Sequence, residues 1–345
     1  MHYVRNHGYV PQLDWHTHTL TLSGIGISTP IELSMDDLLQ MPSRTLPVML
    51  VCAGNRRKEQ NMVKQSLGFS WGAAAVSTAV WTGVPLWALL KKCGIDFESV
   101  EDCNVHVAFE GSETLPKGKY GTSLPLVKAM DRPSDVLLAY KMNGEFLPPD
   151  HGFPLRLIIP GYIGGRMVKW LKNIDIRSHE SDNHFHYFDN RVLPTTVQDA
   201  ETANSGKWWF KPEYIINELN VNSVITKPSH GECIDTNNDK LFYTFKGYAY
   251  AGGGRKVIRV ELSFDDGATW KLCEIHPSSK TLLPTKYGKY WCWSFWSYQV
   301  SLSIVADLSM VAVRAWDASM NTQPDNITWV REMSFFFLNK IYIIL

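Results

Sequence analysis

The sequence lacks the features that mark several broad classes of protein. No run approaches the ~20 uninterrupted apolar residues that span a bilayer, and the N-terminal stretch has no apolar core of a signal peptide. The 34 lysines and arginines balance 34 aspartates and glutamates, which argues against a nucleic-acid-binding surface driven by bulk charge. We therefore expect a soluble, cytoplasmic protein that binds neither membranes nor nucleic acids.

Recognisable cofactor and disulfide motifs are also scarce. The six cysteines lie at wide, irregular spacings with no CxxC pair, so neither a structural zinc site nor a disulfide framework is indicated. The sequence contains no GxGxxG dinucleotide motif and no haem motif. Most of the cysteines are therefore interpreted as reduced, buried side chains.

Two sequence textures divide the 345 residues, which are enough for two domains with their own cores. Up to about residue 200, apolar strands predicted at 46–51, 105–109 and 155–159 alternate with helix-like stretches such as 86–93. Beyond residue 205, short strands are predicted at 242–250, 256–264, 291–300 and 310–316, with Asp266-Gly267 as a hairpin signal. The expected fold is an α+β domain followed by an all-β sandwich.

One cysteine stands in a chemically distinctive place. Cys52 directly follows the apolar run 46–51, and the cations Arg56, Arg57 and Lys58 come shortly after it. Nearby positive charge lowers the pKa of a thiol, and a thiolate is a soft metal ligand. Two interpretations stay open on these local grounds: a reactive or metal-bound cysteine, or a buried structural cysteine beside a solvated basic turn.

The residues around Cys52 resemble a known family. The stretches 51–64, VCAGNRRKEQNMVK, and 68–81, GFSWGAAAVSTAVW, are similar almost residue for residue to the molybdenum domain of eukaryotic assimilatory nitrate reductases, which belong to the sulfite oxidase superfamily. Further matching stretches are 3–7, 119–123, 150–154, 164–170, 208–226, 286–293 and 321–324. The resemblance covers residues 2 to 329, nearly the whole chain.

The resemblance implies a domain plan. It implies a sulfite-oxidase-type molybdopterin domain over 1–204 and an immunoglobulin-like domain over 205–329 that forms a homodimer. The tail 330–345 departs from the family pattern, and it is interpreted as a truncation or a mis-joined segment, with a final strand as the alternative. Members of the family continue into a cytochrome b5-type haem domain, the expected electron donor, and an FAD and nicotinamide domain, for which this chain carries no motif.

The resemblance also implies a molybdenum-molybdopterin centre with Cys52 as the one protein ligand of the metal. Pterin and phosphate contacts are implied for Tyr3, Val4, Arg5, Asn6, His7, Glu113, His151, Arg156, Arg166, Met167, Val168 and Lys169. A pterin phosphate is a dianion that needs guanidinium or backbone donors. Taken alone, each position has a plainer interpretation: Arg5 and Arg156 as surface charges, and His151 as a turn cap.

The implied substrate is nitrate, and the implied reaction is oxygen-atom transfer that releases nitrite. A planar monoanion needs positive charge near the metal and a donor that orients it. Arg57 and Arg5 are the candidate anion-binding residues, and Trp71 is either a wall of the substrate pocket or a core tryptophan. Asn190 occupies the place where sulfite oxidases carry a tyrosine, so it is the candidate that orients nitrate.

Two alternatives are kept. A sulfite oxidase would share the fold, the cysteine and most pterin contacts, but Asn190, Ser294 and the run 58–64 favour nitrate reductase. The second alternative is an inactive cofactor-binding or dimerisation fragment, because the chain starts within a pterin motif and lacks the electron-supplying domains. Nitrite formation with a chemical electron donor, compared with sulfite-dependent electron release, separates the two enzymes.

Overall fold

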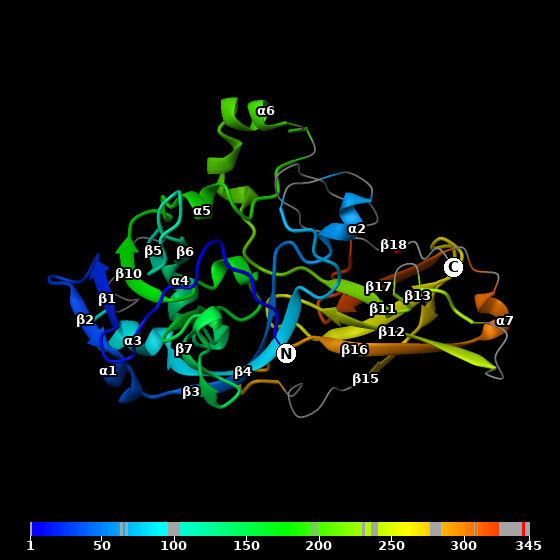
Figure 1. Cartoon of the computed structure of the whole chain (residues 1–345), viewed down its shortest axis with the longest axis horizontal. Coiled ribbons are helices and arrows are strands. Elements are labelled where there is room, and N and C mark those ends of the chain that lie inside the picture. Colours follow the sequence, from blue (N-terminus) through cyan, green and yellow to red (C-terminus); the bar gives the residue numbers. More distant parts are fainter. Residues whose placement is uncertain are drawn as a thin grey trace. The chain divides into compact units, whose positions relative to one another are not determined.

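We describe the protein from a computed structural model (Figure 1). The structure describes residues 2–62, 65, 68–95, 104–194, 196–197, 199–229, 232–235, 241–276, 284–306, 308, 310–323 and 340–341. The chain forms two compact units: unit 1 comprises Met1–Ala53 and Val76–Asn217, and unit 2 comprises Gly54–Ala75 and Glu218–Leu345. The chain passes from unit 1 into the main part of unit 2 between Asn217 and Glu218, whereas the predicted domain boundary is 204/205. The sequence does not indicate that Gly54–Ala75 belongs with the second unit.

Unit 1 is built from two sheets and several short helices. One sheet is mixed and the other is antiparallel. Its strands are β1 (Thr19–Gly24), β2 (Ile31–Ser34), β3 (Arg44–Val51), β4 (Val76–Pro85), β5 (His106–Gly111), β6 (Gly121–Pro125), β7 (Leu137–Met142), β8 (Glu145–Phe146), β9 (Arg156–Ile158) and β10 (Leu171–Arg177). Its helices are α1 (Met35–Leu39), α3 (Leu86–Lys92), α4 (Leu126–Met130), α5 (His184–Tyr187) and α6 (Ala200–Ser205), and short 3-10 turns include η4 (Gly164–Arg166). This mixture confirms the predicted α+β class of the first half.

The strands of unit 1 pair into two separate sheets. One has the order β2-β1-β10-β5-β6, in which β1 and β10 are parallel; the other has the order β3-β4-β7-β8, with β9 also on β7. Strand β3 pairs with β4 along its whole length, and its last four residues are all buried. The predicted strands 46–51, 105–109 and 155–159 correspond to β3, β5 and β9, and the predicted helix 86–93 corresponds to α3.

Unit 2 is a sandwich of two antiparallel sheets with the orders β11-β12-β16-β15 and β14-β13-β17-β18. Its elements are α2 (Arg57–Asn61), β11 (Asn222–Lys227), β12 (Phe242–Tyr250), β13 (Val257–Ser263), β14 (Lys271–Leu272), β15 (Glu274–His276), β16 (Ser294–Ser301), α7 (Leu302–Val305), β17 (Val311–Asp317) and β18 (Lys340–Ile341). Phe245 and Trp296 from one sheet pack with Val260, Leu262 and Val313 from the other in a single core. The predicted all-β second half is confirmed.

Two details of unit 2 refine the sequence-based expectations. Asp266 and Gly267 both adopt positive φ between β13 and β14, but the paired strands begin further out, so the hairpin is wider than a two-residue turn. Most of the tail 330–345 lies outside the described residues, yet Lys340–Ile341 pairs with β17 as β18. None of the helices in the described part of the chain is long and apolar enough to cross a membrane.

Candidate functional site

The end of strand β3 places Cys52 among segments that are distant in sequence. Cys52 is half-buried and directly follows Val51, the last residue of β3. The Tyr3 backbone N–H donates to Ser77 Oγ at 3.1 Å, and Ser77 is the β4 partner of Leu50. A Cβ on Gly164 would lie only 3.0 Å from the Tyr3 hydroxyl and 3.1 Å from the Val51 carbonyl oxygen. The glycine therefore lets η4 approach the end of β3 closely.

The N-terminal segment is held in place by Lys169. The Lys169 ammonium donates to the Arg5 carbonyl at 3.1 Å, to the Asp150 carbonyl at 2.8 Å and to Asn6 Oδ1. Further along the segment, His7 Nε2 lies 3.2 Å from an Asp189 carboxylate oxygen. Val4, in between, is 38% exposed. These contacts bring the predicted pterin residues of the N-terminus to those of the loops after β8 and β9.

A second group of predicted residues surrounds Trp81 of β4. The Arg156 guanidinium lies 4.9 Å from the Trp81 ring centroid and donates to the His151 carbonyl at 2.8 Å. The His2 ring contacts Trp81 edge-on at 5.8 Å and His151 edge-on at 5.2 Å between centroids. Arg156 is only 4% exposed, so it is not the surface charge that its plainer interpretation suggests.

Several buried polar atoms near these side chains lack a partner within the part of the chain that the structure describes. They are His2 Nε2, Ser112 Oγ, Glu113 Oε2 and Arg156 Nε. A buried polar group without a hydrogen bond costs about 1–3 kcal/mol, so such a concentration in one region indicates a place for a polar ligand. His2, Ser112 and Trp81 were not among the predicted site residues. Trp81 ends the matching stretch 68–81, and His2 and Ser112 directly precede the predicted residues Tyr3 and Glu113.

The region around Arg156 and Lys169 contains buried cations that favour an anionic ligand. Burial lowers the pKa of Arg156 to about 10 and that of Lys169 to about 7, and in Lys169 the neighbouring Arg156 adds to the effect. Burial also raises the pKa of Glu113 to about 7 and lowers that of His2 to about 4. For Lys169, the effect of desolvation and of Arg156 thus outweighs the opposing effect of the Asp150 and Glu113 carboxylates. An anionic ligand would restore the charge balance.

The pH dependence of stability tests this account of Lys169. Between pH 7 and 10.5 the unfolded chain carries a proton on Lys169 that the folded, cofactor-free chain does not. Raising the pH through this window should therefore stabilise the wild type relative to Lys169→Met, by up to ~1.4 kcal/mol per pH unit. Urea unfolding of both cofactor-free proteins at several pH values measures the difference. A difference that does not change with pH would contradict the buried, desolvated ammonium.

Arg166 makes several buried hydrogen bonds within unit 1. Its side chain is fully buried; it donates to the carbonyls of Ile216 at 3.0 Å and Asn190 at 3.2 Å, and to Thr122 Oγ1 at 3.0 Å. Met167 and Val168 are also in the core, at 3% and 0% exposed. The Lys169 side chain joins the cluster around the N-terminal segment, whereas the side chains of the other three lie in the interior of unit 1.

The contacts of Arg166 fix Asn190. Asn190 adopts a left-handed conformation with φ of 61°, and its carbonyl also accepts the Ile216 N–H at 2.9 Å. A Cβ on Gly165 would lie 2.6 Å from Asn190 Nδ2, so the second glycine of η4 makes room for this carboxamide. The pair Gly164-Gly165 thus touches the end of β3 on one side and Asn190 on the other, which brings Asn190 towards the region of Cys52.

We expect Arg166→Met to destabilise unit 1 strongly. The change removes the Arg166 donor from the buried Ile216 carbonyl and one of the hydrogen bonds of the Asn190 carbonyl and of Thr122 Oγ1, which should lower the free energy of unfolding by about 2–4 kcal/mol. Urea denaturation measures the loss. Lys172→Met is the control, because Lys172 makes one hydrogen bond to Thr19 Oγ1, and its removal should cost about 1 kcal/mol or less. Equal effects of the two variants would refute the role of Arg166.

The predicted substrate residues Arg57 and Trp71 belong to unit 2. Arg57 begins α2 and is 8% exposed, and Trp71 is half-buried. A Cβ on Gly54 would lie 3.1 Å from Arg57 Nη2 and 3.3 Å from Trp71 Cδ1, and one on Gly68 would lie 2.7 Å from Arg57 Nη1. The Arg57 guanidinium is therefore enclosed by two glycine backbones, with Trp71 beside one of them.

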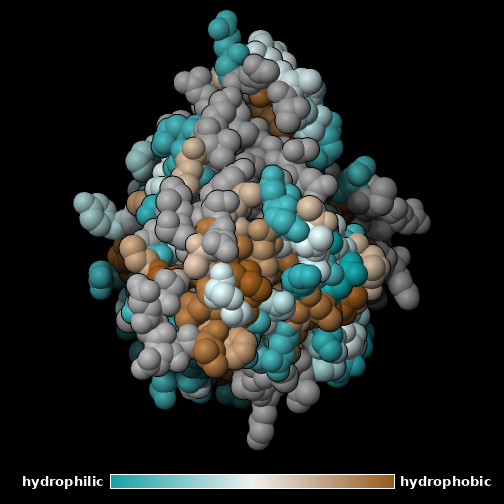
Figure 2. All heavy atoms as spheres, turned by 90° about the vertical axis from the view of Figure 1, so that its right-hand side faces the viewer, coloured by the Kyte–Doolittle hydropathy of each residue, from teal (hydrophilic) through white to brown (hydrophobic). Residues whose placement is uncertain are grey.

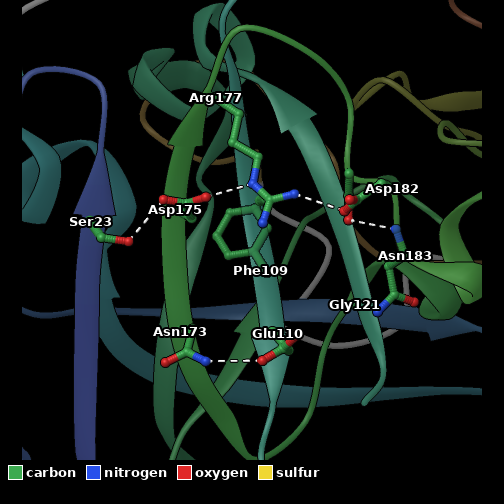
Figure 3. Close-up of a pocket in the computed structure, with 11 residues that line it drawn as sticks. Ser23, Phe109, Glu110, Gly121, Asn173, Asp175, Arg177, Asp182 and Asn183 are labelled. Atoms are coloured by element: carbon green, nitrogen blue, oxygen red, sulfur yellow. Dashed lines mark hydrogen bonds and ion pairs between the residues drawn. The ribbon is translucent and has the colours of Figure 1, made fainter. Parts of the chain in front are cut away.

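A pocket of about 280 Å³ lies elsewhere in unit 1, lined by residues of β1, β5, β6 and β10 and of the segment after β10 (Figure 3). Its charges are largely paired: Arg177 donates to Asp175 at 2.5 Å and to Asp182 at 2.9 Å, and Ser23 donates to Asp175 at 2.8 Å. None of the predicted site residues is among the described residues that line it. Because its charges are satisfied internally, this pocket is a weaker candidate than the Lys169–Arg156 region.

Comparison with known proteins assigns the chain to a family. The family model described as "Oxidoreductase molybdopterin binding domain" matches residues 7–185. The chain belongs to this molybdopterin-binding oxidoreductase family. A second model, "Mo-co oxidoreductase dimerisation domain", matches residues 213–343, which includes β18. The first match covers the Lys169–Arg156 region, and the predicted family assignment is confirmed.

Individual relatives agree with this molybdopterin-binding assignment. The chain is 56% identical over 336 residues to the NADH nitrate reductase of Solanum lycopersicum and 55% identical over 335 residues to NADH nitrate reductase 1 of Arabidopsis thaliana. Each match covers 95% of this chain and 36% of the relative, so the chain spans about a third of the relatives' length. The sulfane dehydrogenase SoxCD of Paracoccus pantotrophus has a TM-score of 0.70 at 24% identity, over 93% of this chain and 72% of that one, which shows the shared fold.

Proposed function

We propose that unit 1 binds molybdopterin and that the loaded chain reduces nitrate to nitrite. The observation that carries the first part is the group of buried, unpartnered polar atoms beside two desolvated cations. Molybdopterin is an anion through its phosphate and dithiolene and has many donors and acceptors along its ring system. The residues present therefore fit this group in charge and in hydrogen-bonding capacity.

The roles of the residues follow from their contacts. Arg156 and Lys169 supply positive charge for the anionic parts of the cofactor, with Arg5 nearby on the N-terminal segment. Ser112, Glu113 and His2 offer the free donors and acceptors for its polar edges. Cys52 is the proposed thiolate ligand of the metal, because it lies at the end of β3 beside Tyr3 and Gly164.

Nitrate as the substrate rests on the relatives and on the positioned polar groups. The molybdenum centre, held by Cys52 and the pterin contacts, would supply the two electrons and the oxygen-atom-transfer chemistry that nitrate reduction requires. Arg57 and Arg5 are proposed to attract the anion, Asn190 to orient it and Trp71 to exclude water from it. Asn190 suits this role because Arg166 and Gly165 fix both its backbone and its carboxamide.

A comparison of two activities tests the proposal. The molybdenum-loaded chain should form nitrite from nitrate with reduced methyl viologen as the electron donor. It should show little or no sulfite-dependent reduction of ferricyanide. Sulfite oxidation without nitrite formation would favour the sulfite oxidase alternative, and a loaded chain with neither activity would favour the inactive fragment.

The remaining parts of the proposal concern partners. Most of unit 2 matches a dimerisation domain. It exposes large apolar side chains such as Leu241, at 76%, and Leu272, at 67%. The face of the molecule drawn in Figure 2 has both apolar and polar patches. We infer a homodimer formed through this unit. In a full-length cytoplasmic enzyme of nitrate assimilation, a cytochrome b5-type haem domain and an FAD domain would deliver electrons from a nicotinamide.

A further inference from the structure

A loop that carries a proposed substrate residue is built into the β-sandwich of unit 2. We define the Arg57 loop as Gly54–Ala75. At its neck, the Tyr248 hydroxyl donates to the Ala73 carbonyl at 2.6 Å and accepts from Asn55 Nδ2 at 3.1 Å. Asn55 Oδ1 in turn accepts the Ala75 N–H at 3.0 Å. These hydrogen bonds hold both ends of the loop at strand β12, to which Tyr248 belongs.

Arg56 fastens the same loop to strand β11. Its Nη1 donates to Asn222 Oδ1 at 2.7 Å and to the Ser223 carbonyl at 2.9 Å, while its Nε and Nη2 donate to Glu59 at 2.9 and 2.6 Å. The side chain is 1% exposed. The guanidinium therefore joins helix α2, through Glu59, to the first two residues of β11, and such a buried fork is geometrically specific.

The attachment point on β11 is itself fixed by the opposite sheet. Ser223 Oγ donates to Gln323 Oε1 at 2.6 Å, and the same oxygen accepts the Ala315 N–H at 3.0 Å from β17. Ser223 and Gln323 are 0% and 1% exposed. Arg56 is thus linked to both sheets of the sandwich through fully buried hydrogen bonds.

The backbone of the loop sets the position of Arg57. The Arg56 N–H donates to the Gly72 carbonyl at 2.9 Å, and the Lys58 N–H donates to the Trp71 carbonyl at 2.8 Å, so the two sides of the loop are paired on either side of Arg57. Arg56 adopts a φ of 68°, a left-handed conformation that is unfavourable for a residue with a side chain. Its buried hydrogen bonds to β11 act against this strain.

We propose that Arg56 is a positioning residue, which fixes the Arg57 loop on the β-sandwich so that the Arg57 guanidinium is held ready for nitrate. This inference rests on the proposed function. The sequence suggested Arg56 as one of three cations that could stabilise a Cys52 thiolate, and the structure pairs its charge with Glu59 within unit 2. The dimerisation domain therefore has a second role, in substrate recognition.

The test removes one buried partner of Arg56 on β11 and leaves the loop sequence intact. In the molybdenum-loaded chain, Asn222→Ala should raise the KM for nitrate roughly tenfold to a hundredfold while kcat and molybdenum content change far less. Hydrogen exchange should increase in the loop amides of Arg56 and Lys58. Arg314→Lys is the matched control: it alters a half-buried cation of the same sandwich, paired with Glu261, and should change neither readout.

An unchanged KM for Asn222→Ala would overturn the inference, whether or not exchange in the loop increases. If this variant does not load molybdenum, Arg56→Lys serves as the second variant under the same criterion, because a lysine keeps the charge and loses the fork. Failure of the proposed function has a different signature: Arg57→Ala would then leave the KM for nitrate unchanged, although the loop still loosens in Asn222→Ala.

Discussion

Replacing Cys52 by serine should abolish nitrate reduction by the loaded chain. We expect the nitrite-forming rate with reduced methyl viologen to fall at least ~1000-fold, because a hydroxyl is a harder and far less acidic ligand than a thiol and cannot tune the metal in the same way. Pterin content should fall much less, since the cofactor contacts of Arg156, Lys169 and Glu113 remain. Fluorescence of the extracted pterin and the initial rate measure the two effects.

The control for this variant is another cysteine of unit 1. Cys93 is half-buried and lies at the C-terminal end of α3. It takes part in none of the contacts of the predicted site residues described above. Cys93→Ser should keep both the rate and the pterin content. Retention of nitrite formation in Cys52→Ser would rule out Cys52 as the ligand.

The second large effect is expected for Arg57→Ala. Removing a buried guanidinium that attracts and orients the anion should lower kcat/KM for nitrate about 100- to 1000-fold, the range found when one preorganised donor is lost from an active site. Steady-state kinetics on molybdenum-loaded protein measures the loss. Because alanine leaves a cavity between Gly54 and Gly68, molybdenum content and thermal stability must be measured in parallel.

Arg57→Lys separates charge from geometry. A lysine keeps the positive charge but cannot donate in a planar fork, so we expect part of the activity to return, roughly a tenfold gain over the alanine variant. Equal kcat/KM values for wild type and Arg57→Ala would show that Arg57 does not act on nitrate.

The sequence predicted the fold class because its strands carry strong local signals. Residues 46–51 and 242–250 are apolar or alternating runs bounded by turn residues, and they form β3 and β12. The division of Gly54–Ala75 from unit 1 could not be predicted in this way. It depends on hydrogen bonds between residues far apart in the chain, such as Asn55 with Tyr248, for which local periodicity holds no signal.

The candidate site shows the same limit. Resemblance named Tyr3, Asn6, His151, Arg156 and Lys169, and the structure brings these together. It could not separate Lys169, which joins the cluster, from Arg166, which donates to the Asn190 carbonyl. Residues three positions apart in one motif thus have different surroundings, and these surroundings depend on tertiary contacts that the motif does not contain.

The most direct test of the central claim is the molybdenum content of the purified chain after expression with a supply of the cofactor. The buried cations and unpartnered polar atoms of unit 1 predict a content close to one molybdenum per chain, retained through gel filtration and reduced in Arg156→Ala. A well-folded chain with a metal content near zero would contradict the account.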